Sequence, residues 1–275
     1  MMRVWTLLIL CSILGIGCSK REAVMVSGSS TVLPIVSKAA DRFRMQHTDM
    51  NVVVNAGGSG VGIKQVGEGK IDIGMASRAL TPLEHEKYRA VHLNVRTLAL
   101  DAVVPAVSSE VYDAGVKHLT LAQIGQIYKG EIDNWKEVGG PDREILVIDK
   151  EKARGTRHVF MALVLGDKEA EAPGADLVLG SNNEEQTAIV QSNAAIGMLS
   201  HAWLNAGVKG LAIDVNGNVI QPTRENIENG TFPITRGLFV ITRGEPVGVT
   251  KLFVDYLLGA EGQTIVEASG YVSVR

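Results

Sequence analysis

SGSSTVLPIVSKAADRF, residues 27–43, runs from a glycine- and hydroxyl-rich turn directly into a segment with helical periodicity. The apolar run AVMV over residues 23–26 precedes the turn and is typical of a buried strand. Pro34 fits only the first turn of the helix, and Ser30 or Thr31 is a suitable N-cap. One apolar stripe with i, i+3/i+4 spacing consists of Val32, Ile35, Val36, Ala39 and Phe43. The stretch therefore predicts a strand, a turn and a helix in succession.

The same order of elements repeats immediately downstream. We expect a strand over residues 51–55, a helix over 61–66 and a further strand over 71–75. The turn before this second helix is GGSGVG, residues 57–62, which is again rich in glycine and carries one hydroxyl. Alternation of strands and helices is typical of an α/β protein with a parallel sheet. Residues 23–75 therefore predict a βαβαβ unit.

A third turn of this kind, RGT at residues 154–156, precedes a helix expected over residues 156–165. The start of a helix has backbone N–H groups without an intrahelical acceptor, and the positive end of the helix dipole points the same way. An oxyanion placed there gains donors and charge stabilisation together. Glycine lets the backbone come close, and Ser or Thr adds further donors. The three helix starts predict one anion site if the fold brings them together.

The rest of the chain predicts a second, less regular α/β unit and connections between the two units. After a polar helix that follows Pro82, the extended runs 95–100 and 103–107 are expected to cross between two lobes, with the hinge near Asp101. A return crossing is expected over residues 234–241. The other expected elements are helices over 121–128, 184–191, 247–258 and 262–268, strands over 145–148 and 195–199, and a surface loop over 166–183.

These elements predict an α/β fold of two lobes with the ligand cleft between them, because pockets favour interfaces that open and close on a hinge. Lobe I is expected to comprise residues 23–102 and 238–275. Lobe II is expected to comprise residues 103–237.

The beginning of the chain predicts export. A charged residue precedes an apolar run over residues 4–16, which is too short to span a bilayer comfortably. The ending LGIGC resembles a bacterial lipobox, with residues 1–17 as the signal peptide and Cys18 as the lipidated first residue of the mature chain. Gly15 stands where the lipobox prefers leucine, so an ordinary cleaved secretory peptide is the alternative. Cys11 would be lost with the signal, which leaves no disulfide in the folded body.

Composition and motif spacing argue against several function classes. The chain has 27 Lys and Arg against 30 Asp and Glu, so we expect no nucleic-acid partner. The six histidines lack metal-ligand spacing, and we expect no metal and no cofactor. A nucleophile elbow around Ser59 would need glycine at position 61, where valine stands. The glycines of the same turn fit neither a Walker loop nor a dinucleotide-binding pattern. Binding without catalysis is therefore the simpler interpretation.

Several segments together resemble one known family. They are SGSSTVLP, AGGSGVGIKQ, GKIDIGMASR, LAQIGQIYKGEIDNW, ARGTRHVF, AAIGMLS, FPITRGLFVI and FVDYLLGAEGQTIVEASGYVSV, and they span nearly the whole mature chain. In these segments the chain is similar to the PstS-type phosphate-binding proteins of phosphate ABC importers. The resemblance implies a two-lobed periplasmic-binding-protein fold of type II-like topology. It also implies inorganic phosphate as ligand, importer permease subunits as partners and a location in the periplasm or at the cell surface. We expect a monomer held to a membrane by the lipid on Cys18.

In the family, phosphate is held by backbone N–H groups and hydroxyls at these helix starts. The resemblance assigns that role to Ser30, Thr31, Ser59, Gly155 and Thr156. If the site forms, it has donors from all three turns.

The same resemblance exposes departures near the predicted site. Lys150 stands where an arginine is commoner, Arg154 replaces a serine, and Ser77-Arg78 replaces an aspartate found in well-studied members. That aspartate accepts a hydrogen bond from protonated phosphate, which disfavours sulfate. We expect Lys150, Arg154, Ser77 and Arg78 at the site and Asp101 as the replacement acceptor. The alternatives are another tetrahedral oxyanion, such as sulfate, molybdate or tungstate, and a tethered adhesion or signalling protein on the same scaffold.

Overall fold

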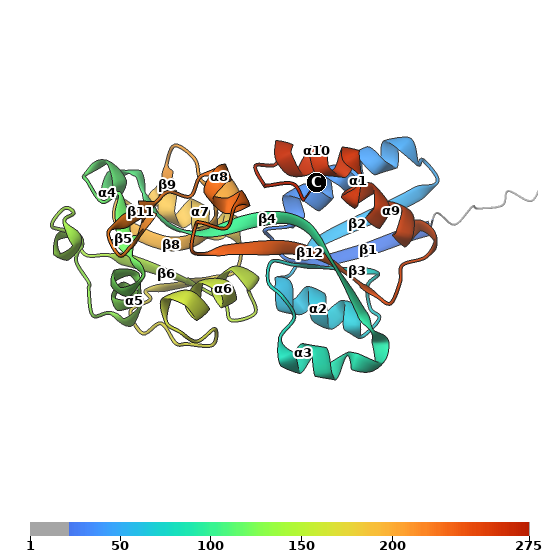
Figure 1. Cartoon of the computed structure of the whole chain (residues 1–275), viewed down its shortest axis with the longest axis horizontal. Helices are drawn as coiled ribbons and strands as arrows, with labels where there is room; N and C mark the ends of the chain where they lie inside the picture. The colour runs from blue at the N-terminus through green and yellow to red at the C-terminus, as the bar shows by residue number, and fades with distance from the viewer. Residues whose placement is uncertain (1–21, 275) are drawn as a thin grey trace, which may run out of the picture.

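The computed structural model describes residues 22–274, and the predicted signal peptide and Cys18 lie outside the described residues. Two lobes lie side by side, and two long strands run from one into the other (Figure 1). The predicted two-lobed α/β architecture is confirmed. Within the described range, no helix is long and apolar enough to cross a membrane.

The first lobe contains the predicted βαβαβ unit. Its strands pair in parallel in the order β2-β1-β3, with β1 in the middle. The elements are β1 (Glu22–Gly28), α1 (Leu33–Gln46), β2 (Met50–Ala56), α2 (Ser59–Gly67), β3 (Ile73–Ala76), α3 (Pro82–Lys87) and, from the end of the chain, α9 (Gly248–Leu258) and α10 (Ala260–Ala268). Helices α1, α9 and α10 cover one face of the sheet and α2 covers the other (Figure 1).

Two antiparallel strands are shared by the lobes. They are β4 (Leu93–Ser108) and β12 (Thr235–Arg243). The first part of β4 pairs with β12, and its last part, from Val103 to Val107, pairs with a strand of the second lobe. The two extended runs predicted for this region are therefore one strand. Asp101, where the hinge was expected, is a register partner of Arg236, and two residues further along, β4 changes its partner strand from β12 to one in the second lobe.

The second lobe continues the same sheet in the order β4-β8-β6-β7. Its elements are α4 (Ser109–Asp113), β5 (His118–Thr120), α5 (Leu121–Lys129), β6 (Leu146–Lys150), α6 (Gly155–Val164), β7 (Leu177–Leu179), α7 (Asn182–Gln191), β8 (Ala195–Ser200), β9 (Val208–Gly210), β10 (Ala212–Val215), β11 (Asn218–Ile220) and α8 (Arg224–Glu228). Short 3-10 turns are η1 (Arg89–Val91), η2 (Trp135–Val138) and η3 (His201–Trp203). The prediction of a simple surface loop over 166–183 is wrong, because β7 lies in this segment and pairs in parallel with β6.

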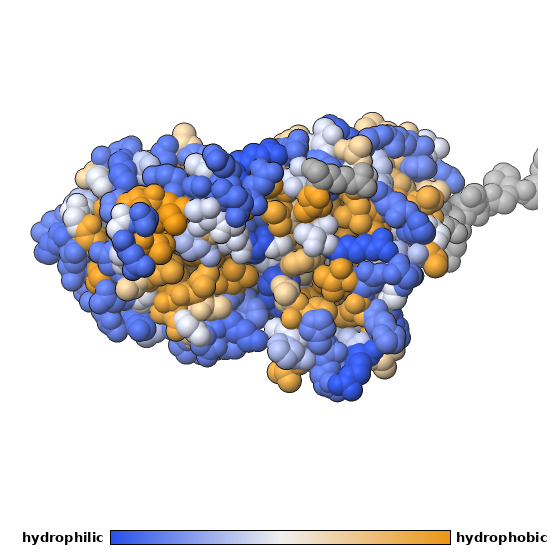
Figure 2. Space-filling model, viewed as in Figure 1, coloured by the Kyte–Doolittle hydropathy of each residue, from blue (hydrophilic) through white to orange (hydrophobic). Residues whose placement is uncertain are grey.

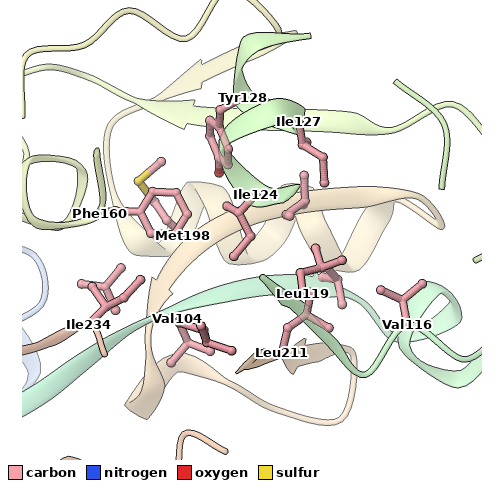
Figure 3. Packing of buried hydrophobic residues seen from close by; sticks show 14 of the residues in the cluster. Val104, Val116, Leu119, Ile124, Ile127, Tyr128, Phe160, Met198, Leu211 and Ile234 are labelled. Atoms are coloured by element: carbon pink, nitrogen blue, oxygen red, sulfur yellow. The ribbon is translucent and has the colours of Figure 1, made fainter. Parts of the chain in front are cut away.

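Separate apolar cores hold the lobes. One cluster takes its buried residues from β1, α1, β3, α9 and α10 together with the neighbouring parts of the crossing strands. Another lies between β4, β8, α5 and α6, where Val104, Ile124 and Phe160 point toward one another (Figure 3). The predicted lobe limits, 23–102 with 238–275 and 103–237, remain a prediction that this division of the core favours.

We expect Gly62→Ala to lower the free energy of unfolding by about 1–3 kcal/mol, because α2 packs closely on the sheet. A Cβ at Gly62 would lie 2.7 Å from the carbonyl oxygen of Ser27 and 2.8 Å from that of Met75. Urea unfolding measures the effect. The matched control is Gly60→Ala in the same helix, where the nearest atom to the new Cβ would be 3.4 Å away. Equal stability of the two variants would contradict this packing.

Candidate anion-binding site

The first and third predicted helix starts meet between the lobes. Thr31 lies in the turn after β1, and Thr156 lies in the first turn of α6. Their Oγ1 atoms are 3.4 Å apart, although 125 positions separate them in the chain, and both residues are almost completely buried. Ser30 lies in the same turn as Thr31 and is half-buried. The lobes are closed on each other, with hydrophilic residues along the seam between them (Figure 2).

The second helix start lies against the third. Ser59 Oγ accepts a 3.0 Å hydrogen bond from the amide N–H of Ser77 and lies 3.2 Å from the Ser77 hydroxyl. A Cβ added to Gly155 would lie 2.3 Å from Ser59 Oγ and 2.6 Å from Ser77 Oγ. The amide N–H of Gly60 donates to the carbonyl oxygen of Ala153 at 3.1 Å. Glycine at position 155 is therefore what lets the two lobes approach so closely.

Backbone donors at these starts remain available. In the part of the chain that the structure describes, the amide N–H groups of Ser59, Gly155 and Thr156 have no protein acceptor within hydrogen-bond distance. Buried N–H groups in folded proteins almost always have a partner, so unpaired ones at three converging positions indicate a ligand that supplies an acceptor. The helix dipoles favour an anionic ligand. The arrangement provides donors for an oxyanion.

An ion pair on the crossing strands borders this site. Arg236 donates from Nε and Nη2 to Oδ2 of Asp101 at 2.9 and 2.7 Å. The same guanidinium donates to Thr156 Oγ1 at 3.0 Å and to Thr31 Oγ1 at 3.4 Å. Arg236 is 7% exposed and Asp101 fully buried. Arg236 was not among the residues predicted for the site. The signal that could have identified it is a lone charge within the apolar run 234–241, which was expected to cross back between the lobes.

Asp101 has different partners from those expected of a phosphate acceptor. Besides Arg236, it accepts from the Ser200 hydroxyl at 2.7 Å and lies 3.0 Å from Nδ1 of His201. Each carboxylate oxygen of Asp101 has two hydrogen-bond partners, so all four lone pairs of the group are occupied. Burial by itself would raise the pKa of Asp101, but the Arg236 charge and the His201 and Ser200 hydrogen bonds outweigh it and lower this pKa. The structure thus places Asp101 behind the site as a partner of Arg236.

The other cations predicted for the site have carboxylate partners within their own lobes. Arg78 makes two hydrogen bonds to Glu84 at 2.8 Å, and the partly exposed Arg154 pairs with Glu151 while lying against Gly58. Their role as direct anion ligands stays a prediction, and each guanidinium also has a carboxylate partner in its own lobe.

Lys150 is also paired. Its Nζ contacts the carboxylate of Glu185, and both residues are almost completely buried. Burial raises the pKa of Glu185, and the Lys150 charge opposes that rise. The Lys150 ammonium therefore serves a buried ion pair within the second lobe.

A fourth helix start contributes a residue that the sequence analysis missed. Ser181 caps α7 in a capping box with Glu184, and Asn182 follows it. Asn182 Nδ2 donates to Thr31 Oγ1 at 3.0 Å across the lobes and is 1% exposed. The Ser-x-x-Glu spacing of the capping box could have identified this start from the sequence.

The geometry defines a class of protein: a two-lobed binding protein whose anion site lies between the lobes. The sequence matches the PBP superfamily domain over residues 19–261. It is 33% identical to the phosphate-binding protein PstS of Bacillus subtilis over 253 residues, which cover 92% of this chain and 81% of that protein. The chain therefore belongs to the PstS family of phosphate-binding proteins, as the resemblance predicted.

Two solved structures share the fold along nearly the whole chain. One is a substrate-binding protein from Clostridium perfringens, assigned to a phosphate ABC transporter and containing bound phosphate. It has 31% identity and a TM-score of 0.83, with coverage of 92% of this chain and 100% of that one. The other is an ABC-type phosphate transport receptor from Vibrio cholerae. It also has 31% identity, with a TM-score of 0.73 and coverage of 90% and 99%.

The lowered pKa of Asp101 gives a pH-dependent stability with a definite sign. A carboxyl group whose pKa is lower in the folded state stabilises the fold above its unfolded pKa of about 3.9, and this stabilisation disappears as the pH falls through the folded value. We expect Asp101→Asn to cost about 3 kcal/mol of unfolding free energy at pH 7. The cost should shrink at pH 3, as measured by urea unfolding at both pH values. An equal cost at both would show that the charge of Asp101 has no part in stability.

Proposed function

We propose that this protein binds inorganic phosphate outside the cytoplasm and delivers it to an ABC-type importer. Membership of the PstS family and the phosphate-containing Clostridium perfringens structure support this role. The observation that carries the proposal is the convergence of Thr31, Ser59 and Thr156 between closed lobes, with unpaired N–H groups at the helix starts of Ser59 and Thr156. It is a binding protein and not an enzyme, because its family consists of substrate-binding components.

The proposed ligands are the donors at these starts. We assign Ser30, Thr31, Ser59, Gly155 and Thr156 to the phosphate, each through a backbone N–H or a hydroxyl. A hydrogen bond to a charged group contributes about 1.5–3 kcal/mol. Six to ten such donors would thus cover the roughly 8 kcal/mol of a micromolar site after the costs of ordering and desolvation.

The proposed location follows from the family. One relative is a phosphate-binding protein and another is a substrate-binding protein assigned to a phosphate ABC transporter, which supports a location outside the cytoplasm for this protein. Lipid attachment at Cys18, anchoring of a monomer to a membrane and docking on permease subunits are proposals that rest on the lipobox-like ending and the family.

Selectivity among oxyanions follows from the acceptors at the site. Because the lone pairs of Asp101 already have donors, a protonated phosphate would have to donate to a hydroxyl such as that of Ser59 or Ser77. A hydroxyl can donate a hydrogen bond as well as accept one, whereas a carboxylate can only accept. A hydroxyl therefore weakens the binding of a fully deprotonated ion less than a carboxylate does. We propose phosphate as the preferred ligand, with a narrower margin over sulfate than a free carboxylate would give.

Isothermal titration of the chain beginning at Ser19 with phosphate, arsenate, sulfate and molybdate tests the ligand. We expect phosphate and arsenate to bind with a dissociation constant of about 1 μM or below, and sulfate and molybdate to bind more weakly. Titrations at two pH values reveal which protonation state binds. Saturable sulfate or molybdate binding tighter than phosphate binding would assign the protein to another oxyanion, and no binding of any of the four would reject an anion-binding role.

Gly155→Ala tests the site itself. The new methyl group would meet Ser59 and Ser77 across the cleft, so we expect phosphate affinity to fall at least ~10-fold, a loss of about 1.4 kcal/mol or more. The unfolding free energy should change little, because each lobe keeps its own core. The matched control is Ser109→Ala at the start of α4, which removes a hydroxyl outside the cleft. Wild-type affinity in Gly155→Ala would place phosphate elsewhere.

A further inference from the structure

Among the described residues, four cationic side chains near the closed cleft differ in the lobe in which their hydrogen-bond partners lie. Arg78 donates to Glu84 and the Ala79 carbonyl, and Arg154 pairs with Glu151. Lys150 donates toward the Ser181 carbonyl in addition to its pairing with Glu185. All these partners lie in the same lobe as the cation. The fourth cation, Arg236, contacts hydroxyls from both lobes, which sets it apart.

The guanidinium of Arg236 makes two sets of hydrogen bonds, one to Asp101 and one to the threonine hydroxyls. Nε and Nη2 hold Oδ2 of Asp101, and this contact fixes the plane of the group. The other edge donates from Nη1 to Thr156 and from Nη2 to Thr31. Nη1 also lies 3.3 Å from the carbonyl oxygen of Ser77. The edge that carries Nη1 therefore faces the point where the helix starts converge, and the two threonine hydroxyls and the Ser77 carbonyl oxygen accept its hydrogen bonds.

We infer that Arg236, oriented by Asp101, supplies the positive charge that holds the bound oxyanion, and that Lys150, Arg78 and Arg154 do not. This inference rests on the proposed function and adds to it a residue outside the helix starts. The hydroxyls of Thr31 and Thr156 rotate, so they can pass from Arg236 to an anion while the guanidinium donates to the same anion. Asp101 is then a positioning residue, because it acts through Arg236.

The position of the arginine in the fold supports this assignment. Arg236 and Asp101 are register partners on β12 and β4, the two strands that the lobes share. Thr31 and Ser77 approach the guanidinium from the first lobe, and Thr156 approaches it from the second. The charge therefore stands at the hinge, while closure of the lobes adds uncharged donors around it.

Phosphate titration of three variants tests the assignment, with folding checked by circular dichroism and urea unfolding. Asp101→Asn/Arg236→Gln removes the pair together, so no unpaired charge remains buried. We expect it to fold and to bind phosphate about 10- to 100-fold more weakly than the wild type. Arg236→Lys keeps the positive charge but loses the planar guanidinium, so its phosphate affinity should lie between those of the wild type and the double variant. Arg96→Gln is the matched control, because Arg96 lies on β4, in the same ladder as Arg236, but pairs with Glu245 at the surface.

The pH dependence of phosphate affinity separates a binding charge from a structural one. In the wild type, affinity should rise as phosphate passes from monoanion to dianion, and this rise should be smaller in the double variant. A folded double variant that binds within about 3-fold of the wild type and keeps the full pH dependence would overturn the role of Arg236. Failure of the wild type to bind phosphate would instead reject the proposed function, so the two failures are distinguishable.

Discussion

The Asp101–Arg236 ion pair joins the two strands that the lobes share, and the groups on either side of the cleft are arranged around it. A buried carboxylate beside a guanidinium is tolerated only when both are paired and hydrogen-bonded, which here requires Ser200, His201 and the two threonines. These partners come from both lobes. The pair thus ties the geometry of the hinge to the positions of Thr31 and Thr156, and the closed cleft is the arrangement that satisfies all of these groups.

Closure of the cleft also depends on the smallest residues in it. Gly155 leaves room for Ser59 and Ser77, and Gly62 lets α2 lie directly on the backbone of β1 and β3. Backbone N–H groups and hydroxyls then meet without a side chain in between. Arg78, Lys150 and Arg154 are paired with glutamates, so under our proposal the oriented backbone and hydroxyl donors, together with Arg236, hold an anion. Such donors recognise shape and hydrogen-bonding state as well as charge.

Local patterns predicted the first lobe and the helix starts well, because turn chemistry and apolar periodicity act between near neighbours. The strand, turn and helix from residue 22 to residue 46 agree with the prediction within a few positions. Contacts between residues far apart in the sequence were not predicted. Lys150 was expected to face an anion, and only the packing of α7 on β8 brings Glu185 to it. Arg236 and Asn182 lie 205 and 151 positions from Thr31, so no spacing rule connects them.

The ladder between β4 and β12, which has one register shift between Leu238 and Phe239, has a mechanical consequence. A hinge made of flexible loops would let each lobe tilt in many directions, whereas a hydrogen-bonded pair of strands bends and twists along few paths while keeping its bonds. We therefore expect the two lobes to move relative to each other as nearly rigid bodies and in few directions. Binding of a ligand between the lobes would then change the relative position of the two outer surfaces, which a partner that contacts only the outside of the molecule could sense.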